Sequence, residues 1–292
     1  MSKVNQTKLI EKNVPVLCPP CREEYLTDLI SKEGKVYIKR ECCKEEPEIL
    51  ENDSEFFSKW RKKAKLRPNA QTKENFFKSN EKSQNIGVST ILVYVTNNCN
   101  MNCPICFRNF GEDFRNRKNI SPEELYKQIR GYKDKIVYLT GGEPTLRKDI
   151  FELIRSIKKS GNYPGIGTNG IKLADKDYLK KLVSSGLHIV SLQFDGFKKE
   201  HEEIIRGKSY IREKKNALKN LSKFPQLNVR LGSTFGKGIN LNQLKPIMKF
   251  IQKNKFIDSI SAFGLTWENE RNSTTSISDI LKYLENENYI SR

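Results

Sequence analysis

The sequence has no run of 18 consecutive apolar residues, so we expect no transmembrane helix. It starts with Met-Ser-Lys-Val-Asn-Gln, which lacks the apolar segment of a secretory signal, and we therefore expect a cytoplasmic protein. No cysteine follows Cys106, which excludes cysteine-ligated centres in the remainder of this sequence. Acidic residues are scarce: 35 Asp and Glu face 53 Lys and Arg, a formal charge of +18. This excess favours anionic partners, nucleic acid among them, although a solvated Lys-rich surface explains it equally well.

Three of the seven cysteines lie together, with C-x3-C-x2-C spacing, at Cys99, Cys103 and Cys106. They follow the apolar, β-branched run 90–95, which predicts a buried strand. We therefore expect them on a loop at the carboxyl end of a strand, where α/β sheets place their sites. Three thiolates can hold three irons of a [4Fe–4S] cluster and leave one iron open for an external ligand. A zinc site or a set of buried thiols is the alternative, and zinc would need a fourth ligand.

A second motif, Gly141-Gly142-Glu143-Pro144, follows the apolar run 136–139. Glycines at the end of a strand let the backbone approach a ligand closely, although alone this motif is typical of an ordinary strand-to-helix turn. Together with the cysteine loop, it resembles the radical S-adenosylmethionine (SAM) superfamily over about residues 88–266. One departure is Ile105, where many members carry an aromatic residue.

The resemblance implies that the three cysteines bind a [4Fe–4S] cluster and that SAM chelates its fourth iron. An electron from the cluster, supplied by a reductant such as flavodoxin or ferredoxin, would cleave SAM to methionine and a 5′-deoxyadenosyl radical that abstracts hydrogen from the substrate. The segment that meets the amino group of SAM corresponds to Gly141, Gly142 and Glu143.

Further SAM contacts are expected at the ends of later strands. Asn169, in a Thr-Asn-Gly segment that resembles one of the family, is expected to face SAM, although an Asn-Gly turn would look the same. Ser191 and Gln193 alternate along a strand that contacts SAM in the family, while Asp195 is expected to form a turn. Arg206 is expected to pair with the SAM carboxylate or an anionic substrate, or else to lie on the surface.

The other four cysteines lie near the N-terminus, at Cys18, Cys21, Cys42 and Cys43. A C-x2-C pair, a short strand and a second pair resemble a rubredoxin or zinc-ribbon module, which would bind one iron or zinc. Adjacent cysteines reach one tetrahedron with difficulty, so one of the second pair is a candidate bystander; four free thiols are the alternative. A cysteine knuckle before the core resembles the tetraether-lipid-synthase-like branch of the superfamily.

From residue 90 onward, predicted strands alternate with helices, which indicates an α/β chain with a partial, open (β/α)6 TIM-like barrel. Asp149 and Asn240 are predicted helix caps, and a helix carrying Phe56, Phe57 and Trp60 is expected to pack on the barrel. The predicted divisions are a metal module at 1–50, a helix and polar linker at 51–88, the barrel at 89–266 and a polar tail with one helix at 267–292.

These patterns favour a radical SAM enzyme, of oxidoreductase or transferase type, that abstracts hydrogen from an unactivated carbon of a small molecule or lipid. The basic charge keeps a second hypothesis open, in which RNA or a peptide is modified. A non-catalytic protein that binds metal or nucleic acid is the third, and the intact motifs argue against it.

Overall fold

The computed structural model describes residues 7–17, 24–38, 48–65, 90–106, 119–265 and 274–289. These residues fall into two compact units. The first unit gathers the described residues up to 65 together with 235–241, 264–265 and 274–289, and the second holds 90–234 and 242–263. No helix in these ranges is long and apolar enough to cross a membrane.

The first unit contains a four-stranded antiparallel sheet in the order β1-β2-β3-β4. Its strands are β1 (Lys8–Leu17), β2 (Glu24–Lys32), β3 (Lys35–Ile38) and β4 (Glu48–Glu51). A two-residue turn joins β2 to β3, with Glu33 at φ 52° and Gly34 at φ 76°, as a tight hairpin requires. The four N-terminal cysteines lie outside the described residues, so the predicted metal module stays a prediction.

Helix α1 (Ser54–Lys65) packs on this small sheet. Phe57 is buried there with Leu29 and Val36. The prediction that this helix packs on the barrel is therefore wrong for Phe57. An apolar side chain on a helix has no preference for one sheet over another, because burial alone stabilises it. Helix α9 (Ile277–Asn286) begins with a capping box of Ser276 and Asp279, and it lies in the predicted tail.

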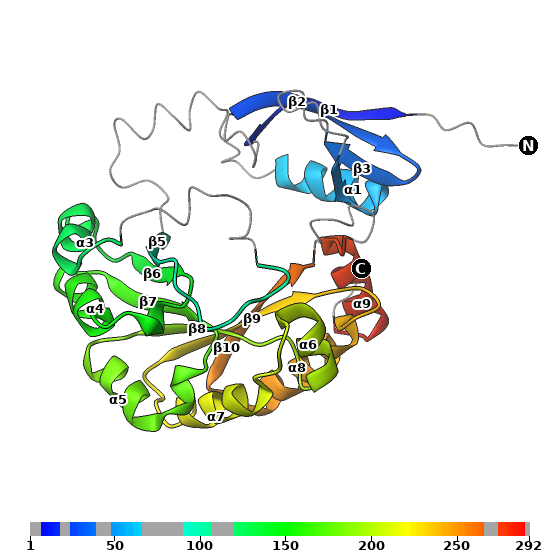
Figure 1. Cartoon of the computed structure of the whole chain (residues 1–292). Helices are drawn as coiled ribbons and strands as arrows, with labels where there is room; N and C mark the ends of the chain where they lie inside the picture. The colour runs from blue at the N-terminus through cyan, green and yellow to red at the C-terminus, as the bar shows by residue number, and fades with distance from the viewer. Residues whose placement is uncertain are drawn as a thin grey trace, which may run out of the picture. The chain divides into compact units, whose positions relative to one another are not determined.

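The second unit is built on a six-stranded sheet in the order β10-β9-β8-β7-β6-β5. Figure 1 shows this sheet curved, with helices along its outer side. Its strands are β5 (Thr90–Thr96), β6 (Ile136–Gly141), β7 (Tyr163–Thr168), β8 (Ile189–Gln193), β9 (Asn228–Phe235) and β10 (Ile257–Gly264). Each neighbouring pair from β5 to β9 is parallel. The predicted α/β class is therefore confirmed, and the parallel sheet is consistent with a partial barrel.

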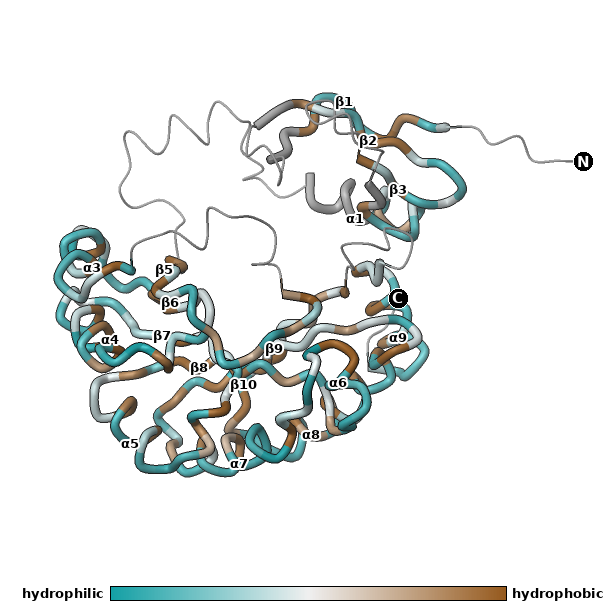
Figure 2. Tube along the Cα trace, in the orientation of Figure 1, coloured by the Kyte–Doolittle hydropathy of each residue, from teal (hydrophilic) through white to brown (hydrophobic). Residues whose placement is uncertain are grey.

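Helices and short 3-10 turns connect the strands of this sheet. The helices are α3 (Pro122–Ile129), α4 (Ile150–Lys159), α5 (Lys176–Ser184), α6 (Lys199–Arg206), α7 (Ile211–Leu221) and α8 (Leu244–Lys253). The 3-10 turns are η3 (Pro144–Leu146), η4 (Lys172–Ala174) and η5 (Leu241–Gln243). In Figure 2 the strands are mostly white to brown and the outer loops teal, which places the apolar core between sheet and helices.

Local sequence signals explain several of these elements. Helix α3 starts with a capping box in which Ser121 and Glu124 each accept a backbone N–H of the other. Asp149 occupies the N-cap position of α4 as predicted, but its carboxylate does not cap the helix and pairs with the Arg147 Nε at 2.8 Å. The predicted cap of α8 by Asn240 is wrong. The turn η5 separates Asn240 from the start of α8, and Asn240 Oδ1 accepts the Gly236 N–H at 2.7 Å.

Candidate functional site at the carboxyl ends of the strands

The cysteine loop, residues 97–106, leaves the carboxyl end of β5 as the sequence predicts. Cys99, Cys103 and Cys106 are free thiols of intermediate exposure. The Cys106 N–H donates to the Cys103 carbonyl oxygen at 3.0 Å, and the Met101 N–H donates to the Cys99 Sγ at 3.4 Å. The loop therefore folds back on itself and presents its three sulfur atoms from one short segment.

The Gly-Gly-Glu-Pro turn after β6 holds the start of this loop. The Gly142 N–H donates to the Thr96 carbonyl oxygen at 2.6 Å, and the Glu143 N–H donates to the Asn98 carbonyl oxygen at 2.7 Å. Gly141 has φ 130°, and a Cβ there would lie 2.3 Å from the Thr96 carbonyl oxygen. Only glycine fits so close an approach, so the two motifs are joined through their backbones.

The Glu143 side chain is 1% exposed and forms hydrogen bonds within the protein. One carboxylate oxygen accepts from Thr145 Oγ1 at 2.6 Å and Thr168 Oγ1 at 2.8 Å, and the other accepts from the Asn169 N–H at 2.7 Å. Burial raises the pKa of Glu143, and these hydrogen bonds partly oppose that rise. The segment lies where a SAM-binding turn is expected, but its carboxylate is directed to β7 rather than outward.

Asn169 connects the end of β7 to the cysteine loop. Its Nδ2 donates to Asn100 Oδ1 at 2.8 Å, and its Oδ1 accepts the Ile171 N–H at 3.0 Å. The predicted Asn-Gly turn is present, since Gly170 has φ 80°. The turn and the contact with the cysteine loop thus occur together.

Ser191 and Gln193 lie on the same face of β8, as their alternation predicts. Both amide atoms of Gln193 are bound within the protein: its Nε2 donates to Asp195 and its Oε1 accepts from the Lys214 Nζ. Gln193 is therefore engaged with neighbouring charges, while Ser191 stays a proposed SAM contact.

Arg206 is held by Asp195 in a nearly buried ion pair. Its Nε donates to Asp195 Oδ2 at 2.8 Å and its Nη2 to Asp195 Oδ1 at 3.0 Å. Burial alone would lower the pKa of Arg206, because it disfavours the charged guanidinium. The attraction of the Asp195 carboxylate is larger, and the pKa of Arg206 is raised. Asp195 thus binds the Nε and Nη2 side of the guanidinium, and the predicted pairing of Arg206 with a SAM carboxylate or an anionic substrate stays a prediction. Asp195 likewise serves the ion pair rather than only a turn.

Sequence reasoning missed a second buried pair, between Lys214 on α7 and Glu202 on α6. The two side chains are 1% and 5% exposed. Glu202 Oε2 also accepts the Tyr210 N–H at 2.8 Å and the Ser209 hydroxyl at 2.9 Å. A signal was present, because Lys214 stands on the buried stripe of α7 that continues through Ala217, Leu218 and Leu221.

The inner face of the sheet carries another arginine, Arg230 on β9. Arg230 lies opposite Ser191 in the register of β8 and β9, and Ser191 lies opposite Gly167 on β7. Burial raises the pKa of Tyr138, and the positive charge of Arg230 partly opposes that rise. At Gly167 a Cβ would meet only Thr140 Oγ1, at 3.7 Å. This row of small and polar side chains leaves Arg230 accessible from the inner face.

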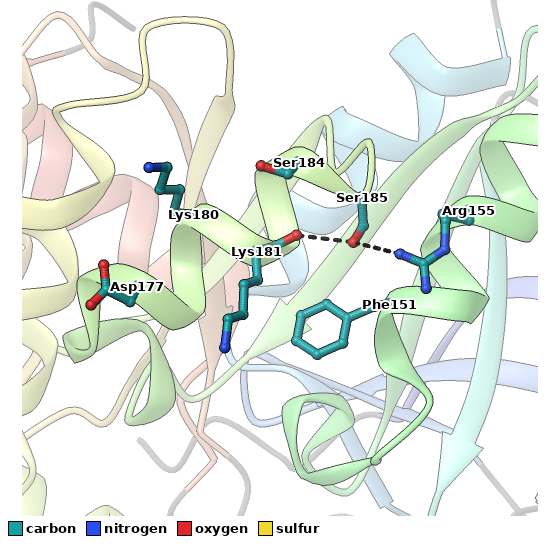
Figure 3. A pocket seen from close by; sticks show the side chains of 7 residues that line it. All are labelled: Phe151, Arg155, Asp177, Lys180, Lys181, Ser184 and Ser185. Carbon is teal, nitrogen blue, oxygen red and sulfur yellow. Dashed lines mark hydrogen bonds between the residues drawn. The ribbon is translucent and has the colours of Figure 1, made fainter.

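A separate hollow lies between helices α4 and α5 (Figure 3). In it the Ser185 hydroxyl donates to the Lys181 carbonyl oxygen at 2.9 Å and accepts from Arg155 at 3.4 Å. Its lining comes from the helices and not from the carboxyl ends of the strands. We therefore place the candidate site at the cysteine loop rather than here.

The three cysteine sulfurs match the ligand set of a [4Fe–4S] cluster with one open iron. Among the described residues, no three His, Cys, Asp or Glu side chains are grouped as a site for one metal ion. A cubane cluster gives each thiolate its own iron and so suits three separate sulfur donors. The three thiols also lie near enough to one another to interact, as a shared cluster requires. Burial raises the pKa of Cys103, and Cys99 and Cys106 add to that rise. Backbone N–H donation to the Cys99 sulfur is the kind of contact that supports a cluster ligand.

The chain is similar in sequence to known proteins. The sequence model of the radical SAM superfamily matches residues 93–251. The chain is 31% identical over 261 residues to the 7,8-dihydro-6-hydroxymethylpterin dimethyltransferase of Methanocaldococcus jannaschii, covering 84% of this chain and 51% of that protein. It is also 31% identical over 175 residues to the protein named Probable GTP 3′,8-cyclase of Thermococcus kodakarensis, covering 57% of this chain and 54% of the relative. The chain thus spans about half the length of these curated relatives.

Solved structures share the fold. Streptococcus suis SuiB bound to S-adenosylmethionine aligns with a TM-score of 0.55 at 18% identity, over 80% of this chain and 58% of that one. The structure of anSMEcpe with bound AdoMet aligns with a TM-score of 0.54 at 19% identity, over 68% of this chain and 59% of that one. The superfamily implies a [4Fe–4S] cluster and SAM as cofactors. The chain belongs to the radical SAM superfamily of enzymes.

Proposed function

We propose that this chain is a radical SAM enzyme whose cluster is bound by Cys99, Cys103 and Cys106. The observation that carries the proposal is the backbone connection between the cysteine loop and the Gly-Gly-Glu-Pro turn. When bound, the cluster and SAM would supply an electron and a 5′-deoxyadenosyl radical that abstracts hydrogen from the substrate. The chain's own residues would bind and orient SAM and exclude water.

Arg230 is a further proposed contact for the SAM carboxylate, beside the predicted contact at Arg206. Arg230 lies beside Ser191 in the sheet, and its charge acts on the phenol of Tyr138. A carboxylate entering there would form a charge-assisted hydrogen bond with Arg230 without displacing another carboxylate. The backbone of Gly141 and Gly142 is the proposed contact for the SAM amino group, while Glu143 keeps that turn in place.

The proposed substrate is a small fused-ring heterocycle of the pterin or guanine type. Support comes from the two curated relatives, whose names specify a pterin and GTP; both compounds contain a 2-amino-4-oxopyrimidine ring. The relative that covers most of this chain is named as a dimethyltransferase. Lipid, RNA or peptide substrates, which the sequence also allows, are the competing outcomes.

The proposal has two further parts. One concerns the N-terminal cysteines, which lie outside the described residues, and the other concerns a partner protein. The N-terminal cysteines are proposed to bind a mononuclear iron or zinc, and their C-x2-C spacing supports this. Flavodoxin or ferredoxin is the proposed reductant, and the net charge of +18 would attract such an acidic partner.

The substrate test uses protein reconstituted anaerobically with iron and sulfide, then given SAM and dithionite. We expect 7,8-dihydro-6-hydroxymethylpterin or GTP to increase 5′-deoxyadenosine formation severalfold over the substrate-free rate, and the Cys103→Ala variant to show no increase. An increase with lipid extract, RNA or peptide, and none with either heterocycle, would overturn the substrate class while leaving the enzyme class intact.

A further inference from the structure

Arg206 lies next to the cysteine loop and is paired with Asp195. Burial raises the pKa of the Cys103 thiol, and the positive charge of Arg206 partly opposes that rise. The Arg206 and Asp195 side chains are 12% and 2% exposed. Solvent therefore screens this interaction only weakly. Among the described residues, Arg206 thus places a buried positive charge near the Cys103 sulfur.

Neighbouring residues fix the guanidinium at this position. Gly207 ends α6 at φ 78°, and a Cβ there would lie 3.1 Å from the Asn102 carbonyl oxygen, so the end of the helix is in close contact with the cysteine loop. On its other side, the Asp195 carboxylate also accepts the Thr234 N–H at 2.8 Å. Arg206 Nη2 lies 3.3 Å from Thr234 Oγ1, to which it donates. These contacts hold the positive charge in one place near the cysteine loop.

We propose that Arg206 is a positioning residue that raises the reduction potential of the cluster through its positive charge beside the Cys103 sulfur, and that Asp195 limits this effect. The inference rests on the proposed function, because it needs a cluster at the three cysteines. Reduction adds one negative charge to the cluster, and a nearby positive charge stabilises the reduced form. Asp195 acts in the opposite direction because its carboxylate disfavours added negative charge.

The two partners therefore have opposite predicted effects. Arg206→Gln removes the positive charge, and we expect reduction to become about tenfold less favourable, a shift of roughly 59 mV to more negative potential for one electron. Asp195→Asn removes the negative charge, and we expect a shift to more positive potential. A role in folding alone would change cluster content or melting temperature, but it would not give shifts of opposite sign.

The experiment is a redox titration of the reconstituted full chain without SAM, with the reduced cluster followed by electron paramagnetic resonance. Iron content and circular dichroism verify that each variant is loaded and folded, and Arg155→Gln, a surface change of the same charge on α4, is the matched control. If Arg206→Gln assembles no cluster, Arg206→Lys is measured in its place. Lysine keeps the positive charge but lacks the planar guanidinium, so we expect a smaller negative shift of the potential. Equal potentials in loaded wild type and variants, or shifts of the same sign, would overturn the inference. A wild type that assembles no cluster would instead overturn the proposed function.

Discussion

The Glu143 carboxylate accepts the Asn169 backbone N–H at 2.7 Å, which joins two sequence motifs that lie 26 residues apart. Asn169 in turn donates from its side chain to Asn100 in the cysteine loop. The ends of β5, β6 and β7 are thereby connected by one set of hydrogen bonds. Glu143 thus helps to fix the shape of the candidate site through these hydrogen bonds, and its predicted contact with SAM stays a prediction.

Glu143→Gln should destabilise the chain and weaken SAM binding. The amide offers one acceptor oxygen where the carboxylate offers two, so one of the donors Thr145, Thr168 or Asn169 loses its partner in a buried site. A hydrogen bond to a buried charged group is worth about 1.5–3 kcal/mol. We expect a loss of that size in the free energy of unfolding, measured by urea denaturation, and an unchanged value would show that Glu143 is not bound as described.

Gly141→Ala should disrupt the junction between the two motifs. The added Cβ would meet the Thr96 carbonyl oxygen at 2.3 Å, and φ 130° is itself unfavourable for alanine. We expect a loss of more than about 1 kcal/mol in unfolding free energy, together with reduced iron content after reconstitution. Gly131→Ala is the control, since a Cβ there meets nothing within 4 Å. Equal behaviour of the two variants would contradict the close approach at Gly141.

Arg230→Gln should weaken SAM binding about tenfold, as expected when a hydrogen bond between two charged groups, worth roughly 1.5 kcal/mol, is lost. Equilibrium dialysis of SAM against cluster-loaded protein measures this. Arg212→Gln, at an exposed position on α7, removes the same charge elsewhere and should bind SAM normally. If both variants bind like the wild type, the SAM carboxylate is held by another group.

The first unit should lose stability in acid through Asp53 and Asp279. Lys282 and the Phe56 N–H hold the pKa of Asp53 below its usual value against the effect of burial. Asn52 and Ser276 do the same for Asp279. For a carboxyl with a lowered native pKa, the stabilisation is present above about pH 4 and is lost as pH falls through the lowered native value.

Amide hydrogen exchange in α9, compared between pH 6 and pH 3, measures this loss. We expect exchange, corrected for its intrinsic pH dependence, to accelerate in acid for the wild type and to change less for Asp279→Asn, which lacks the titrating carboxyl. Asp258→Asn, at an exposed position on β10, serves as the control. Identical acid responses of wild type and Asp279→Asn would show that Asp279 does not carry the effect.

The sequence predicts the sheet and the motif positions well, because both follow local patterns. The β-branched run 90–95 and the capping box at Ser121 need no tertiary information. The bonding of the polar residues was not predictable in this way. Whether Arg206 meets an incoming carboxylate or Asp195 depends on where α6 ends relative to β8, which spacing along the chain does not reveal. Lys214 shows the same limit, since a lysine on an apolar stripe is buried only when a partner such as Glu202 is there.

The central claim is that the three cysteines bind a cluster that cleaves SAM. Its most direct test measures iron and sulfide per chain after anaerobic reconstitution, followed by dithionite-driven formation of 5′-deoxyadenosine from SAM, in wild type and in Cys103→Ala. We predict about four irons per chain, or about five with a filled mononuclear site. We also predict deoxyadenosine from the wild type and none from the variant. Zinc without a cluster and no deoxyadenosine, or equal deoxyadenosine from both proteins, would contradict the account.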